Sequence, residues 1–248
     1  MTGVEDITED RLLDGRVMLR QPRSGTFRTT IDPVLLAAAV PARPGERVLE
    51  AGCGTGAGFL CLAARVPDLT ITAVERDAAL AELARANGAA NGLDAPRLAV
   101  IEGDVQDLAL ARRHGPSEHA FANPPWWPGG TPPPAAQRRG ATHAAEAGLG
   151  DWAAFLSAGL VPGGTLTLIL PAARFDAGVA GLEAAGCGAM RLIPLWPRAG
   201  VAAKRVLLQG RKGRRGPARV EPGLVLHGAG QAYTDAAEAA LRGGAAFG

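Results

Sequence analysis

This chain of 248 residues has few cysteines and no long apolar run. Its three cysteines are odd in number and lack metal-ligand spacing, so neither a disulfide nor a metal site is expected, and a reducing cytoplasm fits: Cys53, Cys61 and Cys187. Because no apolar run approaches the roughly 20 residues that cross a bilayer, no membrane partner is expected. The polar, acidic residues 1–10 argue against a secretory signal.

Lysine is also scarce, and the basic residues that are present cluster. The formal net charge is only +2, yet one stretch holds eight basic residues and no acid: Arg198, Lys204, Arg205, Arg211, Lys212, Arg214, Arg215 and Arg219. A sparser series lies near the start: Arg16, Arg20, Arg23 and Arg28. Such clusters can bind phosphates, although a solvated face is the commoner explanation.

Short apolar or β-branched runs alternate with alanine-rich stretches of helical character. Strands are expected at 47–50, 69–75, 98–101, 119–122, 165–170, 190–195 and 206–209, with helices at 59–65, 77–87, 151–160 and 175–185. Strands that alternate with helices predict an α/β fold with a mostly parallel sheet covered on both faces. Without repeats or linkers we expect one domain, 1–248, with a leading segment 1–40, a core 41–212 and a basic tail with a short helix, 213–248.

The first expected strand ends in a glycine-rich loop. Gly52, Gly54 and Gly56 would let the backbone approach a ligand, as in nucleotide-binding turns. Glu75, at the end of the second strand, lies 19 residues after Gly56 and matches an acceptor for a ribose hydroxyl. Glu50 precedes the glycines, where a carboxylate would repel a pyrophosphate but could hold an ammonium group. These details favour S-adenosylmethionine over a nicotinamide dinucleotide.

Two further polar positions follow strands. Asp104, after the third strand, could accept a hydrogen bond from an adenine amino group, and helix capping is its alternative explanation. The fourth strand runs into Asn123, Pro124, Pro125 and Trp126. Proline ends the strand because it cannot donate a ladder hydrogen bond. The Asn123 amide oxygen and the Pro124 carbonyl would then accept from an exocyclic NH2 group, and Trp126 offers a face on which a base can stack.

In this order, these motifs resemble those of class I S-adenosylmethionine-dependent methyltransferases that modify amino groups. Flanking segments are similar to the bacterial valine-tRNA adenine-N(6)-methyltransferase family: 21–22, 27–37, 203–208, 211–213, 224–227 and 233–234. That resemblance implies a Rossmann-like fold with a seven-stranded sheet, and it places Arg28, Thr30 and Asp32 against the methionine end of the cofactor. Asp32 before Pro33 is equally well explained as a helix N-cap. The family usually carries tyrosine where Trp126 stands.

The expected reaction is methylation of the exocyclic amine of an adenine in a tRNA anticodon loop. In it Lys204, Arg205, Arg211, Lys212, Arg214 and Arg215 would hold tRNA phosphates, on a segment after an expected edge strand. Three alternatives stay open, namely a ribosomal RNA amino-group methyltransferase, a release factor glutamine N-methyltransferase and a non-catalytic RNA-binding module. The proline-rich stretch 127–148 is expected to be a loop, either a lid or a mis-assigned element.

Overall fold

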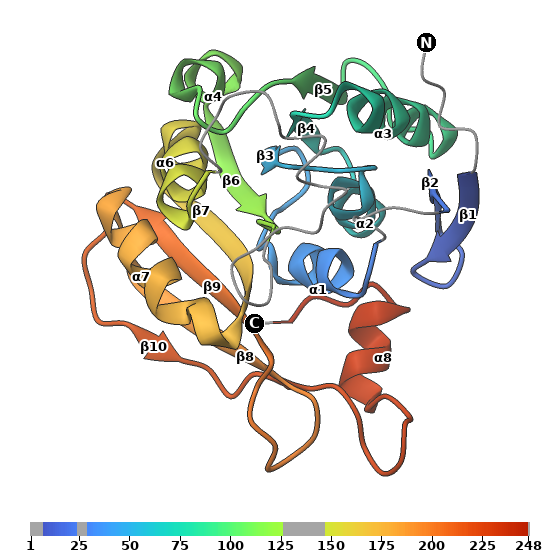
Figure 1. The fold of residues 1–248 in the computed structure, drawn as a ribbon, viewed down its shortest axis with the longest axis vertical. Coiled ribbons are helices and arrows are strands. Elements are labelled where there is room, and N and C mark those ends of the chain that lie inside the picture. The colour runs from blue at the N-terminus through green and yellow to red at the C-terminus, as the bar shows by residue number, and fades with distance from the viewer. Residues whose placement is uncertain (1–6, 24–28, 126–146, 248) are drawn as a thin grey trace.

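The computed structural model describes residues 7–23, 29–125 and 147–247. Their centre is one sheet whose seven longer strands lie in the order β5-β4-β3-β6-β7-β9-β8 (Figure 1). These are β3 (Arg47–Ala51), β4 (Thr70–Glu75), β5 (Leu98–Glu102), β6 (Ser117–Ala122), β7 (Leu160–Pro171), β8 (Cys187–Trp196) and β9 (Arg205–Lys212). Of these seven, β9 alone is antiparallel to its neighbours, so the predicted mostly parallel, seven-stranded sheet is confirmed.

Two strands of two residues extend this sheet. Both β10 (Arg219–Val220) and β11 (Leu224–Val225) pair in parallel with β8, which accounts for a nine-stranded sheet. Neither was expected, because two residues are too few for a periodic signal. A 3₁₀ turn (Ala172–Arg174) follows β7. The short C-terminal helix α8 (Asp235–Leu241) is present as expected.

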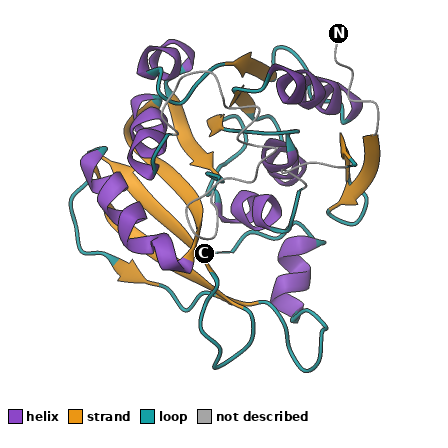
Figure 2. Ribbon diagram, viewed as in Figure 1, coloured by secondary structure: helices purple, strands orange, loops and turns teal. Residues whose placement is uncertain are grey.

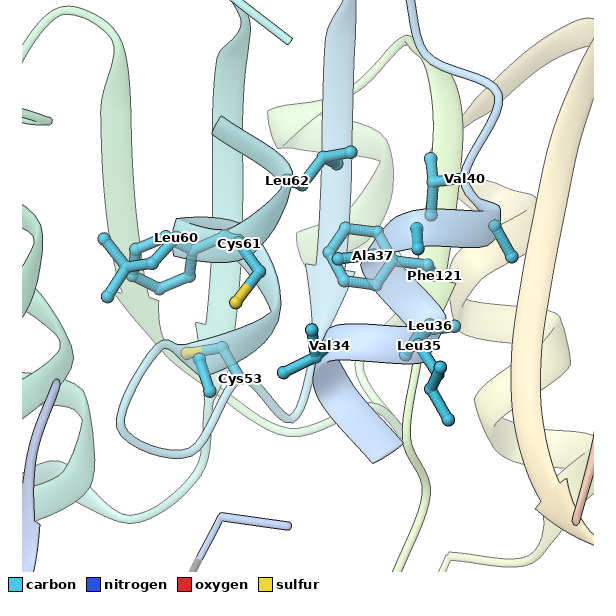
Figure 3. Packing of buried hydrophobic residues seen from close by; sticks show 14 of the residues in the cluster. Val34, Leu35, Leu36, Ala37, Val40, Cys53, Leu60, Cys61, Leu62 and Phe121 are labelled. Atoms are coloured by element: carbon cyan, nitrogen blue, oxygen red, sulfur yellow. The ribbon is translucent and has the colours of Figure 1, made fainter. Parts of the chain in front are cut away.

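Helices cover both faces of the sheet (Figure 2). One face carries α1 (Asp32–Ala39), α2 (Ala57–Arg65) and α3 (Ala78–Ala90), and the other carries α4 (Leu108–His114), α6 (Leu149–Ala158) and α7 (Phe175–Ala184). Each group packs into its own apolar cluster. Figure 3 shows α1 and α2 packed in the first cluster, with Phe121 of β6 beside Ala37. None of the described helices is long and apolar enough to cross a membrane.

An N-terminal hairpin lies outside the main sheet. Its strands, β1 (Ile7–Leu12) and β2 (Val17–Pro22), pair only with each other and pack near α2 and α3. The hairpin is anchored by the buried side chains of Leu13, Val17 and Leu19, which belong to the first cluster. The sequence did not reveal these strands because charged residues interrupt their alternation.

Three local predictions were wrong. β9 is not an edge strand, because it lies between β7 and β8. Asp32 is the first residue of α1 rather than its N-cap: Ile31 is the cap, and the Asp32 carboxylate pairs with Arg205 instead. The strand expected to begin at Thr165 begins at Leu160, and its pairing with β6 is irregular before Thr165, where Gly163 has a φ of +78°.

Candidate functional site

The glycine loop and the Asn123 segment meet at one edge of the sheet. β3 and β6 are neighbouring parallel strands, so the loop after β3 and the residues after β6 leave the sheet side by side. From β3 the chain enters α2 on one face, whereas the next described helix after β6 is α6 on the other face. A crevice at such a switch point, outside the carboxyl ends of parallel strands, is where open α/β sheets bind ligands.

The three glycines of the loop have positive φ angles. Their values are +64° at Gly52, +56° at Gly54 and +97° at Gly56, a conformation that other residues adopt at a cost. A Cβ atom would lie 2.5 Å from the Trp152 ring at Gly52 and 2.5 Å from the Phe59 ring at Gly56. At Gly54 it would meet nothing within 4 Å. Gly52 and Gly56 therefore serve packing, while Gly54 borders open space.

Glu75 is directed at the glycine loop. One carboxylate oxygen accepts from the Gly54 N–H at 2.9 Å, and the other accepts from the Asp77 N–H at 2.9 Å. Burial raises the pKa of Glu75, and these backbone hydrogen bonds oppose that rise. Each oxygen keeps a further lone pair, so the carboxylate can also accept from a ligand hydroxyl.

Glu50 is a buried carboxyl beneath the same loop. It is 4% exposed, and among the described residues its Oε2 has no hydrogen-bond partner. Burial raises the pKa of Glu50 well above its ordinary value of 4.5, opposed by a hydrogen bond from the backbone of Phe59. A buried acceptor without a partner is costly in a folded protein, and a cationic ligand group would remove that cost.

Asp104 and Thr30 lie at the ends of other elements of this edge. Asp104 follows β5 and accepts from the Gln106 N–H at 2.9 Å, with Arg76 at 3.7 Å. Helix capping does not explain Asp104, because the cap of α4 is Asp107. The Thr30 hydroxyl accepts from the Asp32 N–H at 3.2 Å, immediately before α1.

The acceptor segment begins directly after β6. Asn123 is half-buried, Pro124 is buried and Pro125 is exposed. Within the described ranges, the Asn123 carboxamide has no hydrogen-bond partner. The predicted sites at Trp126 and Arg28, and most of the expected loop 127–148, lie outside the described residues.

The basic stretch is divided between the two edges of the sheet. In the β7–β9 register Arg205 lies opposite Pro171, at the carboxyl end of β7, and Arg211 lies opposite Thr165, which pairs with His119 near the amino end of β6. At about 3.4 Å per residue, these positions are roughly 20 Å apart. Lys204 and Arg205 therefore share the edge of Asn123, whereas Arg211, Lys212, Arg214 and Arg215 lie at the opposite edge.

Several of these cations have partners within the protein. Arg205 Nε lies 2.9 Å from Asp32 Oδ2. Lys212 Nζ donates to the carbonyls of Ser157 and Leu160, and Arg211 donates to the Gly163 carbonyl. Arg214 and Arg215 are exposed. The sequence could not reveal the Asp32–Arg205 pair, since its members are 173 residues apart.

The strand order, the glycine loop and the Asn-Pro-Pro segment at the switch point define the class of Rossmann-like methyltransferases. A family model described as a methyltransferase domain matches residues 48–118. A tRNA1(Val) (adenine(37)-N6)-methyltransferase of Aeromonas salmonicida is 33% identical over 206 residues, which cover 82% of this chain and 84% of that protein. The chain therefore belongs to the tRNA1(Val) (adenine(37)-N6)-methyltransferase family of S-adenosylmethionine-dependent methyltransferases.

The chain is also similar to methyltransferases with other named activities. The crystal structure of a predicted O-methyltransferase from Agrobacterium tumefaciens has a TM-score of 0.70 and 27% identity, covering 87% of this chain and 98% of that one. A release factor glutamine methyltransferase of Deinococcus radiodurans is 36% identical over 148 residues, 56% of this chain and 51% of that protein. The methyltransferase core is thus shared among enzymes that have different acceptors.

Proposed function

We propose that this protein transfers a methyl group from S-adenosylmethionine to the exocyclic amine of an adenine in the anticodon loop of a tRNA. The observation that carries the proposal is the position of Asn123 and Pro124. They end β6 beside the glycine loop of β3, with a carboxamide that has no partner among the described residues. Two acceptors next to the cofactor loop suit an NH2 group as the methyl acceptor.

The chain's own residues fit the cofactor. The orphaned Oε2 of Glu50 would accept from the ammonium of the methionine moiety, and Glu75 would accept from the ribose hydroxyls. Asp104 would accept from the adenine amino group, and Gly54 leaves the room that the ligand needs. Arg28 and Thr30 would face the methionine end. When bound, S-adenosylmethionine supplies an electrophilic methyl group on its sulfonium.

The acceptor side works mainly by alignment. The lone pair of the adenine amine is delocalised into the ring, so the amine is a poor nucleophile. Hydrogen bonds from its two N–H groups to the Asn123 oxygen and the Pro124 carbonyl favour a pyramidal nitrogen and stabilise the positive charge that develops there. Pro125 follows these acceptors, and Trp126 would stack on the base. Methylation makes the nitrogen strongly acidic, so no dedicated base is required.

The RNA enters over the same edge of the sheet. A target base must leave its stack, which costs least in a single-stranded loop such as the anticodon loop. Lys204 and Arg205 lie at this edge and would contact phosphates beside the target, with Arg205 oriented by Asp32. Arg211, Lys212, Arg214 and Arg215, at the far edge, would contact phosphates of a more distant part of the tRNA, with Arg214 and Arg215 the most accessible.

Competition among three acceptors tests the proposal. The full chain is incubated with radiolabelled S-adenosylmethionine and equal amounts of unmodified tRNA, small-subunit ribosomal RNA and release factor. We expect the label in tRNA, and none in any acceptor with Asn123→Ala. Label in the release factor would instead support glutamine methylation, the activity named for the Deinococcus relative. Label in ribosomal RNA would mean that ribosomal RNA, and not tRNA, is the methyl acceptor. A chain that binds donor and labels none of the three would contradict the proposal.

A further inference from the structure

Two asparagines of α3 bind the outer edge of the N-terminal hairpin. Asn91 accepts from the Met18 N–H at 2.9 Å and donates to the Met18 carbonyl at 2.7 Å. Asn87 likewise accepts from the Arg20 N–H at 3.0 Å and donates to the Arg20 carbonyl at 2.8 Å. A carboxamide offers the same donor and acceptor as a backbone peptide group, so the two side chains act as a short neighbouring strand for β2. Met18 and Arg20 are two residues apart, the spacing of one strand edge.

Asn87 differs from Asn91 in its remaining hydrogen bond. Its amide nitrogen also donates to the Thr55 carbonyl in the glycine loop, at 2.8 Å. The corresponding nitrogen of Asn91 donates to the Asn87 carbonyl, within α3 itself. Asn87 is fully buried and Thr55 is 5% exposed, so this hydrogen bond is shielded from water. One side chain therefore touches both the hairpin and the loop.

Thr55 occupies a sensitive position in the loop. It lies between Gly54 and Gly56, whose φ angles are +56° and +97°. On either side of it, Gly54 donates to Glu75 and Gly56 donates to the Cys53 carbonyl. The Asn87 amide fixes the peptide group between these two anchors. Asn87 therefore links the loop to α3, in addition to the hydrogen bonds of Gly54 and Gly56.

We propose that Asn87 is a positioning residue that couples docking of the N-terminal hairpin to the shape of the cofactor-binding loop. The hairpin reaches toward the site a second way, since the Gln21 oxygen accepts from the Thr29 N–H at 2.8 Å, next to Thr30. Coupling between two sites is reciprocal. Cofactor binding therefore stabilises the docked hairpin, and loosening the hairpin at Asn87 weakens cofactor binding. This inference rests on the proposed function, because it assumes a cofactor at the glycine loop.

Asn87→Ala and Asn91→Ala form a matched pair of variants. Each removes one peptide-like pair of hydrogen bonds with β2, but only Asn87→Ala also removes the hydrogen bond to Thr55. We measure the affinity for S-adenosylhomocysteine by titration calorimetry, well below the melting temperature of either variant. The expected result is at least tenfold weaker binding by Asn87→Ala and a change within about twofold for Asn91→Ala. Unchanged affinity in Asn87→Ala would overturn the coupling, and equal weakening in both variants would overturn the assignment of Asn87 as the residue that carries it.

Hydrogen exchange at the hairpin gives an independent readout, and Asn87→Asp removes the two donated hydrogen bonds while keeping the size of the side chain. Aspartate keeps an acceptor for the Arg20 N–H, but its carboxylate cannot donate to the carbonyls of Arg20 and Thr55. In the wild type, S-adenosylhomocysteine should slow exchange of the Met18 and Arg20 amides. That slowing should be absent in Asn87→Asp and should persist at Arg20 in Asn91→Ala. Wild-type binding without slower exchange would refute the coupling alone, whereas absence of wild-type binding would refute the proposed function as well.

Discussion

The two edges of the central sheet use polar groups in opposite ways. At the amino edge, Lys212 and Arg211 donate to backbone carbonyls, and His119 bonds Glu46 at 2.9 Å. At the carboxyl edge, the buried Glu50 keeps an oxygen without a partner among the described residues, and the half-buried Asn123 follows β6 at the same edge. The amino edge pairs these cations internally, although two buried nitrogens there, His119 Nδ1 and Arg97 Nε, have no partner among the described residues. The carboxyl edge leaves acceptors that a ligand would satisfy.

Charge density alone therefore does not locate the active edge. The sequence shows its densest positive charge at 211–215, yet the register of β9 places those residues roughly 20 Å from the level of Asn123. The unpaired carboxylate oxygen of Glu50, near the carboxyl end of β3, marks the site more sharply, since an unpaired buried acceptor costs free energy in every unliganded molecule.

Asn123→Ala should have the largest effect. Removing one acceptor that stabilises developing charge costs on the order of 100- to 1,000-fold in turnover. Because the Asn123 oxygen would face the methyl acceptor, the affinity for S-adenosylmethionine should stay within about twofold of wild type. Single-turnover methylation and titration calorimetry on the same preparation separate the two quantities. An active Asn123→Ala enzyme would remove the acceptor role from this segment.

Glu75→Ala should weaken cofactor binding by on the order of 10- to 100-fold, because a charged hydrogen bond contributes about 1.5–3 kcal/mol. The matched control is Glu102→Ala. Glu102 lies opposite Glu75 on the neighbouring strand β5 and is exposed, so its replacement should change affinity by less than about twofold. Similar affinities for the two variants in a calorimetric titration would remove Glu75 from the cofactor site.

Glu50→Gln should separate stability from binding. The pKa of Glu50 is raised by burial, so above pH 4.5 the folded, cofactor-free protein holds a proton there that the unfolded chain has released. The wild-type free energy of unfolding therefore falls as pH rises from 4.5 toward the raised pKa, and cofactor affinity rises over the same window. Glu50→Gln should flatten both trends and bind about tenfold more weakly. Thermal melts and titrations at several pH values check this, and parallel profiles for both proteins would contradict it.

Charge removal at the two edges should have smaller, separable effects. The double variant Arg214→Ala and Arg215→Ala should bind all tRNAs more weakly and to the same extent. The slope of log affinity against log salt should fall by roughly 0.7–0.9 for each phosphate that the variant no longer neutralises. Lys204→Ala, at the active edge, should also reduce turnover at saturating tRNA, because it would contact phosphates beside the target. Filter binding over a salt series and single-turnover rates measure the two effects. An unchanged salt slope in the double variant would make the far edge a solvated face.

Local signals were enough to predict the seven longer strands and to propose site residues at their carboxyl ends. Glycine loops, strand-ending prolines and strand-helix alternation are encoded within a few residues of each other, so the order of Glu50, Glu75 and Asn123 already implied a shared edge. Interactions between distant segments carried no such signal. The Asp32–Arg205 pair, the hydrogen bonds of Asn87 to Arg20 and Thr55, and the insertion of β9 between β7 and β8 arise from topology. The two-residue strands β10 and β11 likewise arise only from their pairing with β8.

The identity of the modified nucleoside shows which group the pocket of Asn123 and Pro124 accepts. The full chain is incubated with S-adenosylmethionine and unmodified tRNA, and the tRNA is digested to nucleosides and analysed by mass spectrometry. A pocket formed by Asn123 and Pro124 at the carboxyl edge predicts N6-methyladenosine, formed by the wild type and absent with Asn123→Ala. A methylated guanosine or cytidine, a ribose methylation, or N6-methyladenosine formed equally well by Asn123→Ala would contradict that account.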